Sequence, residues 1–261
     1  MNPWLQWSAL GCAMVALMSA GWLWQKRRSN AGIVDVLWSA GLGLGALWIA
    51  ATGPGAAAPR TALAVLGGAW AARLAWHLWQ RVSTEPEDGR YRHLREHWGG
   101  HQGKFFGFFM FQAALVLLFA LPFIAVARNP VQGMTPMLLL GLAIWGFAVV
   151  AEGVADRQLA RFRADPSNQG KTCRSGLWRY SRHPNYFFEW LHWFSYVALA
   201  QGSDLAWLAW SGPIVMYIFL RWISGIPYTE ANALRSRGED YRDYQRRTPM
   251  LIPWFPRSPR P

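Results

Sequence analysis

The sequence is poor in charged residues and in cysteine. Only 15% of its 261 residues are Asp, Glu, Lys or Arg, whereas a soluble domain has about 25%, so the composition argues against a soluble globular protein. The two cysteines, Cys12 and Cys173, are far apart, and no Cys-x-x-Cys pair occurs. This spacing argues against a disulfide framework and against a thiol-based zinc or redox motif. We therefore expect two free, inert thiols.

Apolar residues are abundant instead. They make up 52% of the chain, with 18 tryptophans, and they gather in runs of about 20 residues, the length at which a helix crosses a bilayer. In the first run the basic residues follow the apolar part, which is not the pattern of a signal peptide. We predict an all-α, polytopic integral membrane protein with about seven transmembrane helices. The expected spans are residues 4–24, 32–51, 61–80, 105–127, 134–155, 184–202 and 205–224.

The basic residues lie between these spans and predict the orientation. With the N-terminus outside and the C-terminus cytoplasmic, the inner loops hold 22 of the 26 Lys and Arg residues, and the outer loops hold Arg60 and Arg128. Such asymmetry is typical of membrane topology, and it accounts for the net charge of +12 without a nucleic-acid partner. We expect a protein of the bacterial cytoplasmic membrane. The sequence contains no signal for an oligomeric state.

A polar stripe runs along the sixth expected span. Pro184 suits the first turn of a helix, and Asn185, Glu189, His192 and Tyr196 then follow at helical spacing on one face. Two interpretations are open. The stripe forms hydrogen bonds to neighbouring helices, or it lines a water-filled cavity that opens to the inner side, which an intramembrane glutamate favours.

Charged residues cluster on both sides of this stripe in the sequence. Glu152 and Asp156 share one helix face, and Ser224–Pro227 interrupts the last span. The basic residues upstream of the stripe bind either lipid headgroups or a phosphorylated cofactor. They are Arg157, Arg161, Arg163, Lys171, Arg174, Arg179 and Arg182.

These residues carry a resemblance. The run "GLWRYSRHPNYFFEW" at 176–190, the later pattern R-x-x-S-G-x-P-x-x-E at 221–230, and the segments "AGIVDVLWSAG" and "EPEDGRYRHLREHWGG" resemble the steroid 5-alpha-reductase C-terminal domain superfamily. The likeness is greatest to its bacterial branch, whose substrates are mostly unassigned, and it covers nearly the whole chain.

The resemblance implies a seven-helix membrane fold that binds NADPH from the cytosolic side and reduces a carbon–carbon double bond conjugated to a ketone. The substrate would be a steroid- or isoprenoid-like lipid, a hydrophobic small molecule. Within a single membrane domain, residues 1–130 would face the substrate and residues 134–261 would bind the cofactor. The implied cofactor contacts are Glu152, Asp156, Arg163, Tyr180, Asn185 and Arg221, together with the branch-specific motif residues Arg182, His183, Tyr186, Tyr228 and Glu230.

The sequence departs from the steroid-active members at the substrate end. Those members pair Gln-Glu on the second helix with a tyrosine on the third, whereas this chain has Asp35 as its one acid in 32–51 and Trp70 near the tyrosine position. Asp35 and Arg73 either form a buried structural ion pair or replace the missing acid. A donor must stabilise the oxyanion that develops during reduction, and the catalytic candidates are Glu189, Asp35 and Arg73.

Three alternatives compete with a reductase. Membrane methyltransferases of the isoprenylcysteine and phospholipid type also carry R-H-P-x-Y, but S-adenosylmethionine has no phosphate to occupy the arginines. A di-iron oxidase could use His93, His97 and His101, which are four residues apart, although Gly99–Gly100 should break their helix. A non-catalytic scaffold would explain the apolar spans but not the polar motifs between them.

Overall fold

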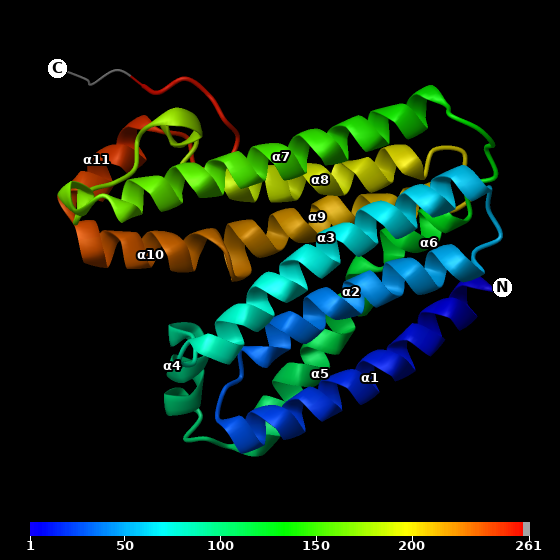
Figure 1. Cartoon of the computed structure of the whole chain (residues 1–261), viewed down its shortest axis with the longest axis horizontal. Coiled ribbons are helices and arrows are strands. Elements are labelled where there is room, and N and C mark those ends of the chain that lie inside the picture. Colours follow the sequence, from blue (N-terminus) through cyan, green and yellow to red (C-terminus); the bar gives the residue numbers. More distant parts are fainter. Residues whose placement is uncertain (258–261) are drawn as a thin grey trace. The chain divides into compact units, whose positions relative to one another are not determined.

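A computed structural model of the chain describes residues 1–257, which form helices and connecting segments with no strand among them (Figure 1). The expected all-α class is therefore confirmed. The chain divides into two compact units, one of Met1–Leu138 with Leu199–Gly212 and one of Leu139–Ala198 with Pro213–Pro261. The assignment of substrate and cofactor to separate parts of the chain stays a prediction.

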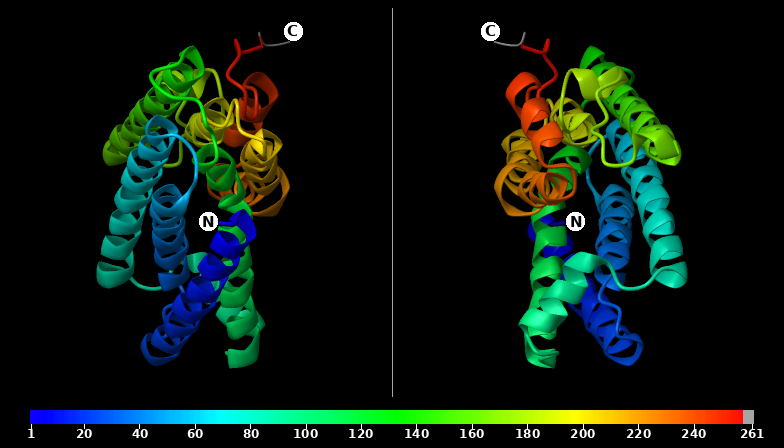
Figure 2. Two further views of the ribbon diagram at one scale, coloured as in Figure 1. Left: turned by 90° about the vertical axis from the view of Figure 1, so that its right-hand side faces the viewer. Right: turned by 90° about the vertical axis from the view of Figure 1, so that its left-hand side faces the viewer.

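The first unit is a bundle of long apolar helices with a short polar helix at one end. α2 and α3 lie side by side (Figures 1 and 2). Gly43 makes this approach close, since a Cβ there would lie 2.7 Å from the Cβ of Ala71. The helices of this unit are α1 (Pro3–Arg28), α2 (Ile33–Thr52), α3 (Ala57–Thr84), α4 (Gly89–His97), α5 (Gln102–Phe119), α6 (Leu121–Ala127) and the 3-10 helix η3 (Ala206–Trp210).

The second unit combines apolar helices with a polar C-terminal helical hairpin. α8 starts at Pro184, as expected, and a π-helical turn at Phe219–Ile223 ends the last apolar helix just before Gly225 (Figure 1). Its helices are α7 (Pro136–Ala164), η1 (Pro166–Asn168), η2 (Gly176–Arg179), α8 (Pro184–Leu199), α9 (Ser211–Ile218), the π-helix η4 (Phe219–Ile223), α10 (Ile226–Arg237) and α11 (Glu239–Arg247).

Within the described residues, five helical stretches are long and apolar enough to cross a bilayer, which supports an integral membrane protein. The expected spans 61–80 and 184–202 are not among them. Arg73, His77 and Arg81 interrupt the apolar surface of α3, and α8 is only 16 residues long. Seven spans and their orientation therefore stay predictions. The five stretches are Pro3–Arg28, Ile33–Thr52, Gln102–Ala127, Pro136–Ala164 and Ala206–Arg247, the last of which is apolar in its first half.

Buried carboxylates fasten α4 to the ends of α1 and α2. Glu87 accepts hydrogen bonds from the backbone N–H of Ala31 at 2.7 Å and from the Arg95 guanidinium at 2.8 Å. The same guanidinium reaches Gln25 at 3.3 Å. Glu87 thus connects the α1–α2 turn with α4, and its side chain is only 11% exposed.

We expect Glu87→Ala to lower the free energy of unfolding by about 2 kcal/mol, because it leaves the partly buried Arg95 guanidinium and the Ala31 N–H without their acceptor. Thermal unfolding in detergent measures the change. Glu85→Ala is the matched control, since Glu85 is 59% exposed and its ion pair with Arg81 is a surface pair. Equal midpoints for the two variants would contradict the role of Glu87.

Candidate functional site

Glu230 is the acceptor at the centre of a polar cluster in the second unit. Its carboxylate accepts from Arg182 Nε at 2.7 Å and from His183 Nε2 at 3.1 Å. It also accepts from Gln245 Nε2 at 2.8 Å and from the Tyr241 hydroxyl at 3.4 Å. Burial lowers the pKa of His183 despite the opposing effect of Glu230, so the neutral imidazole donates its Nε2–H to the carboxylate. We call these five residues the Glu230 cluster.

The Glu230 cluster joins the start of α8 to the C-terminal hairpin. The Arg182 guanidinium donates to the carbonyls of Gln245 and Thr248, and its backbone N–H donates to the carbonyl of Pro249 at 2.9 Å. Arg182, His183 and Glu230 were expected to contact the cofactor. Their polar atoms are directed at one another and at the backbone, which gives them a structural role, while a cofactor contact stays a prediction.

The expected contacts from α7 and α8 come together in part. Asn185 Nδ2 donates to Asp156 Oδ1 at 3.1 Å, and Glu152 lies half-buried one turn earlier on α7. Tyr186 stacks on His183, with ring centroids 5.4 Å apart, and its hydroxyl lies 3.1 Å from Thr229 Oγ1. The meeting of α7 with the start of α8 thus agrees with the expectation from sequence.

The polar stripe of α8 forms contacts within the helix. His192 Nδ1 donates to the backbone carbonyl of Glu189 at 2.7 Å and lies 3.6 Å from its carboxylate. The Glu189 side chain is 18% exposed, whereas His192 and Tyr196 are buried. Hydrogen bonding inside the helix therefore accounts for the Nδ1 atom of His192 but not for its buried Nε2 atom, and both interpretations of the stripe stay open for Glu189.

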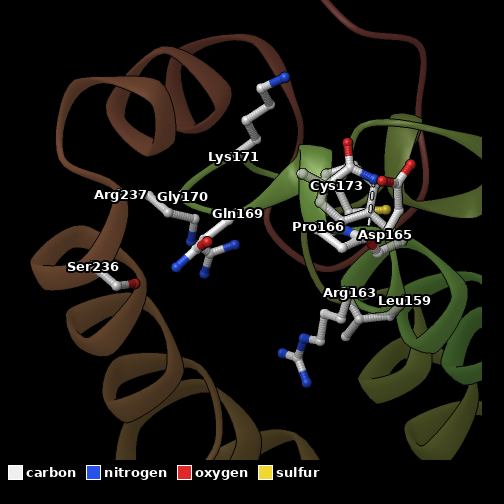
Figure 3. A pocket seen from close by; sticks show the side chains of 12 residues that line it. Leu159, Arg163, Asp165, Pro166, Gln169, Gly170, Lys171, Cys173, Ser236 and Arg237 are labelled. Atoms are coloured by element: carbon white, nitrogen blue, oxygen red, sulfur yellow. Dashed lines mark hydrogen bonds between the residues drawn. The ribbon is translucent and has the colours of Figure 1, made fainter.

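A pocket of about 420 Å³ opens at the polar end of α7 (Figure 3). Arg163 reaches it from α7 and Arg237 from the end of α10, and the positive charge of Arg163 acts on Arg237. Lys171 comes from the loop between them, with its ammonium turned outward (Figure 3). Among the described residues that line the pocket, Asp165 carries the only carboxylate. The full lining is Leu159, Phe162, Arg163, Asp165, Pro166, Asn168, Gln169, Gly170, Lys171, Cys173, Ser236 and Arg237.

The chemistry of this pocket suits an anion attached to an apolar group. Leu159, Phe162 and Cys173 supply an apolar wall, and guanidinium groups bind phosphate oxygens in a bidentate geometry. Its volume lies in the range of small-molecule sites. Of these residues Arg163 was expected to contact the cofactor, whereas Arg237 was missed because its approach to Arg163 depends on the tertiary fold.

Of the eleven expected cofactor residues, Arg163 alone is in the described lining of this pocket, and three of the other ten are Tyr180, Arg221 and Tyr228. Tyr180 accepts a backbone hydrogen bond from Trp254 and packs edge-on against Phe255. The Arg221 guanidinium lies over the ring of Trp222 at 5.5 Å, and Tyr228 is 43% exposed. For these residues the structure shows packing and surface roles, and their cofactor contacts stay predictions.

Of the two interpretations offered for Asp35 and Arg73, the buried ion pair is wrong. Asp35 Oδ1 accepts from the hydroxyl of Tyr91 at 2.6 Å, and Oδ2 lies 3.3 Å from the Arg90 guanidinium. Arg73 belongs to the exposed surface of α3. The partners of Asp35 lie 55 and 56 residues away in sequence, on α4 and not on α3.

Tyr91 is a candidate that sequence reasoning missed, although the segment at 85–100 signalled its surroundings. Burial, together with the charge of Asp35, raises the pKa of Tyr91 well above its usual value. Asp35 and Tyr91 therefore form a phenol–carboxylate pair in which the phenol keeps its proton.

Asp88 lies in the same neighbourhood. Burial alone would raise the pKa of Asp88, but hydrogen bonds from the backbone and side chain of Arg90 lower it.

Two other expectations concern the first unit. Trp70 is buried and packs edge-on against Trp38, with ring centroids 6.3 Å apart, so an aromatic core contact occupies the place expected for a tyrosine. His93 and His97 stack at 6.4 Å. Across residues 1–257, no group of three or more His, Cys, Asp or Glu side chains has the arrangement of a metal site. Cys12 and Cys173 are both free, as expected.

A family model described as a protein of unknown function, DUF1295, matches residues 21–248. The chain belongs to the DUF1295 family. This family is related to steroid 5-alpha-reductase-like proteins. Comparison with curated proteins and with solved structures gives no match. The DUF1295 match includes the Glu230 cluster and the pocket of Arg163 and Arg237, and it ends just before Pro249.

We expect Glu230→Gln to lower the free energy of unfolding by about 3 kcal/mol, because the buried charge of Arg182 loses its counter-charge. Thermal unfolding in detergent and the rate of proteolysis within residues 238–257 measure the effect. The control is Glu239→Gln, whose carboxylate is 73% exposed and pairs with Arg242 on the surface. If the two variants unfold alike, the cluster does not hold the C-terminal hairpin.

Proposed function

We propose that this protein is a membrane-embedded, NADPH-dependent reductase of a conjugated carbon–carbon double bond in a steroid- or isoprenoid-like lipid. The observation that carries the proposal is the pocket in which Arg163 and Arg237 face one cavity beside an apolar wall. The relation of DUF1295 to steroid 5-alpha-reductase-like proteins supports the same reaction class.

The donors of the pocket fit the phosphate groups of a nicotinamide dinucleotide. Within residues 1–257 neither Arg163 nor Arg237 makes an ion pair, and the charge of one acts on the other. A bound phosphate would relieve this repulsion and accept their N–H groups. Leu159 and Phe162 would pack against the adenine ring, and Ser236 or Gln169 would reach its polar edges.

One face of α7 extends this site toward α8. Glu152, Asp156, Leu159 and Arg163 follow the spacing i, i+4, i+7 and i+11, so they lie along one stripe of the helix. The carboxylates of Glu152 and Asp156 and the amide of Asn185 suit hydroxyl and carboxamide groups. The cofactor, when bound, supplies a hydride. The role of these side chains is to hold and orient it.

Reduction of a conjugated double bond develops negative charge on the carbonyl oxygen of the substrate. A hydrogen-bond donor or a cation at that oxygen lowers the barrier. Glu189, Asp35 and Arg73 stay the candidates for this role. Tyr91 joins them as a hydrogen-bond donor, because its phenol keeps its proton; the O–H that now donates to Asp35 would turn to the substrate oxygen and stabilise the developing charge.

S-adenosylmethionine, the cofactor of the competing methyltransferase reaction, carries no phosphate. It also has a positively charged sulfonium, which two facing guanidiniums would repel. The pocket therefore favours the reductase over the methyltransferase.

We expect NADPH to raise the unfolding midpoint of the detergent-purified protein, and S-adenosylmethionine to leave it unchanged. Arg163→Gln and Arg237→Gln should each weaken NADPH binding about tenfold or more, since one charge-assisted hydrogen bond contributes about 1.5–3 kcal/mol. Calorimetric titration measures the affinities.

Arg242→Gln is the control, because Arg242 is 62% exposed and pairs with Glu239 on the surface. It should bind NADPH as the wild type does. Stabilisation by S-adenosylmethionine instead of NADPH would overturn the reductase proposal, and unchanged NADPH affinity in both pocket variants would remove the pocket from it.

A further inference from the structure

Large apolar side chains are exposed in a short segment of the second unit, beyond the range of the family match. Ile252, Trp254 and Phe255 are 58%, 70% and 72% exposed. Such a run of exposed aromatic and aliphatic groups usually marks an interaction surface. We call residues 251–257 the strap.

The strap is held in place by its backbone. Trp254 donates its backbone N–H to the carbonyl of Tyr180 at 2.9 Å, and Arg257 donates to the carbonyl of Arg247 at 2.8 Å. Ser181 Oγ donates to the carbonyl of Leu251 at 2.7 Å, and the Leu251 side chain is buried. The exposed rings are therefore presented by a fixed main chain.

The level of the strap along α7 corresponds to the edge of a bilayer. Trp178, two residues before Tyr180, donates its indole N–H to the carbonyl of Ala155 at 2.9 Å. Ala155 lies 19 residues after Pro136, where α7 begins, which is about 28 Å of helix and close to the thickness of the hydrocarbon core. Charged residues begin at the same level, with Glu152 and Asp156.

Arginines lie within the strap and next to the residues that it contacts. Arg179 is exposed and its guanidinium lies 5.9 Å from the ring centre of Tyr180, and Phe255 packs on the same ring at 5.9 Å. Arg257 is exposed, and Arg247, which pairs with Asp243, is 41% exposed. Aromatic rings beside arginines at the end of an apolar span are typical of the membrane–water interface.

We propose that the strap is an interfacial anchor. The rings of Trp254 and Phe255 enter the headgroup region of the bilayer at the end of α7 where the chain becomes charged, and Arg179 and Arg257 bind anionic phospholipid headgroups. Because the strap is hydrogen-bonded to Tyr180 and Ser181, this contact holds the segment that leads directly into the Glu230 cluster. The proposal is independent of the reductase reaction.

The test places an environment-sensitive fluorophore on the full-length protein. Trp254→Cys is labelled in a background of Cys12→Ser and Cys173→Ala, and the protein is placed in nanodiscs of phosphatidylcholine with or without phosphatidylglycerol. We expect nitroxide lipids labelled near the headgroup to quench this probe at least about twofold more than lipids labelled near the chain end. Phosphatidylglycerol should increase the quenching.

Glu239→Cys in the same background is the control, because Glu239 is 73% exposed at the start of the polar helix α11. Its probe should be quenched by iodide in water and not by the lipids. If the probe at position 254 behaves like this control, the proposal is overturned. The proposal would also be overturned if the quenching depended on the number of protein molecules per nanodisc and not on the position of the nitroxide in the lipid. That result would indicate that a second copy of the chain covers the strap.

Phe255→Cys provides a second labelling site if the variant at position 254 does not fold. Both substitutions remove side chains that are at least 70% exposed, so the unfolding midpoint in detergent should stay close to that of the background protein. Equal quenching with and without phosphatidylglycerol would overturn the assignment of Arg179 and Arg257 to anionic headgroups.

Discussion

The carboxylate of Glu230 is the contact on which the second unit depends. A buried carboxylate is costly unless several donors surround it, and here Arg182, His183 and Gln245 all donate to it. Arg182 belongs to the turn before α8, and Gln245 belongs to α11. One acceptor thus sets the position of the polar hairpin against the apolar helix, and the end of α10 that bears Arg237 is fixed in the same way.

In the first unit, the carboxylates of Glu87 and Asp35 likewise connect a polar segment to the apolar helices. Each accepts from groups far away in the chain, Glu87 from Ala31 and Arg95, and Asp35 from Tyr91 and Arg90. In both units a polar segment is attached to apolar helices by an acid that directional donors surround. Hydrophobic burial is non-directional, so it could not by itself select the position of such a segment.

Features that depend on neighbouring residues could be predicted from the sequence. The start of α8 at Pro184, the break before Gly225 and the apolar helices follow from local conformational preferences and hydropathy. The partners of charged side chains could not be predicted in this way. Asp35 pairs with Arg90, which lies 55 residues away on another helix, and nothing in the local sequence distinguishes Arg90 from Arg73. For the same reason motif residues expected to bind a ligand proved to bind one another.

The balance of charges connects these structural clusters with the candidate site. The chain has 26 Lys and Arg residues and only 14 Asp and Glu residues, and several of the acids hold the polar segments in place. Arg174, for example, is paired with Asp240 and Asp243. The pocket is lined by Arg163, Lys171 and Arg237 against one carboxylate, that of Asp165, and a cavity with such an excess of positive charge attracts an anion from solution. If the proposed cofactor binds here, this excess of basic over acidic residues supplies the positive charge that its phosphate groups need.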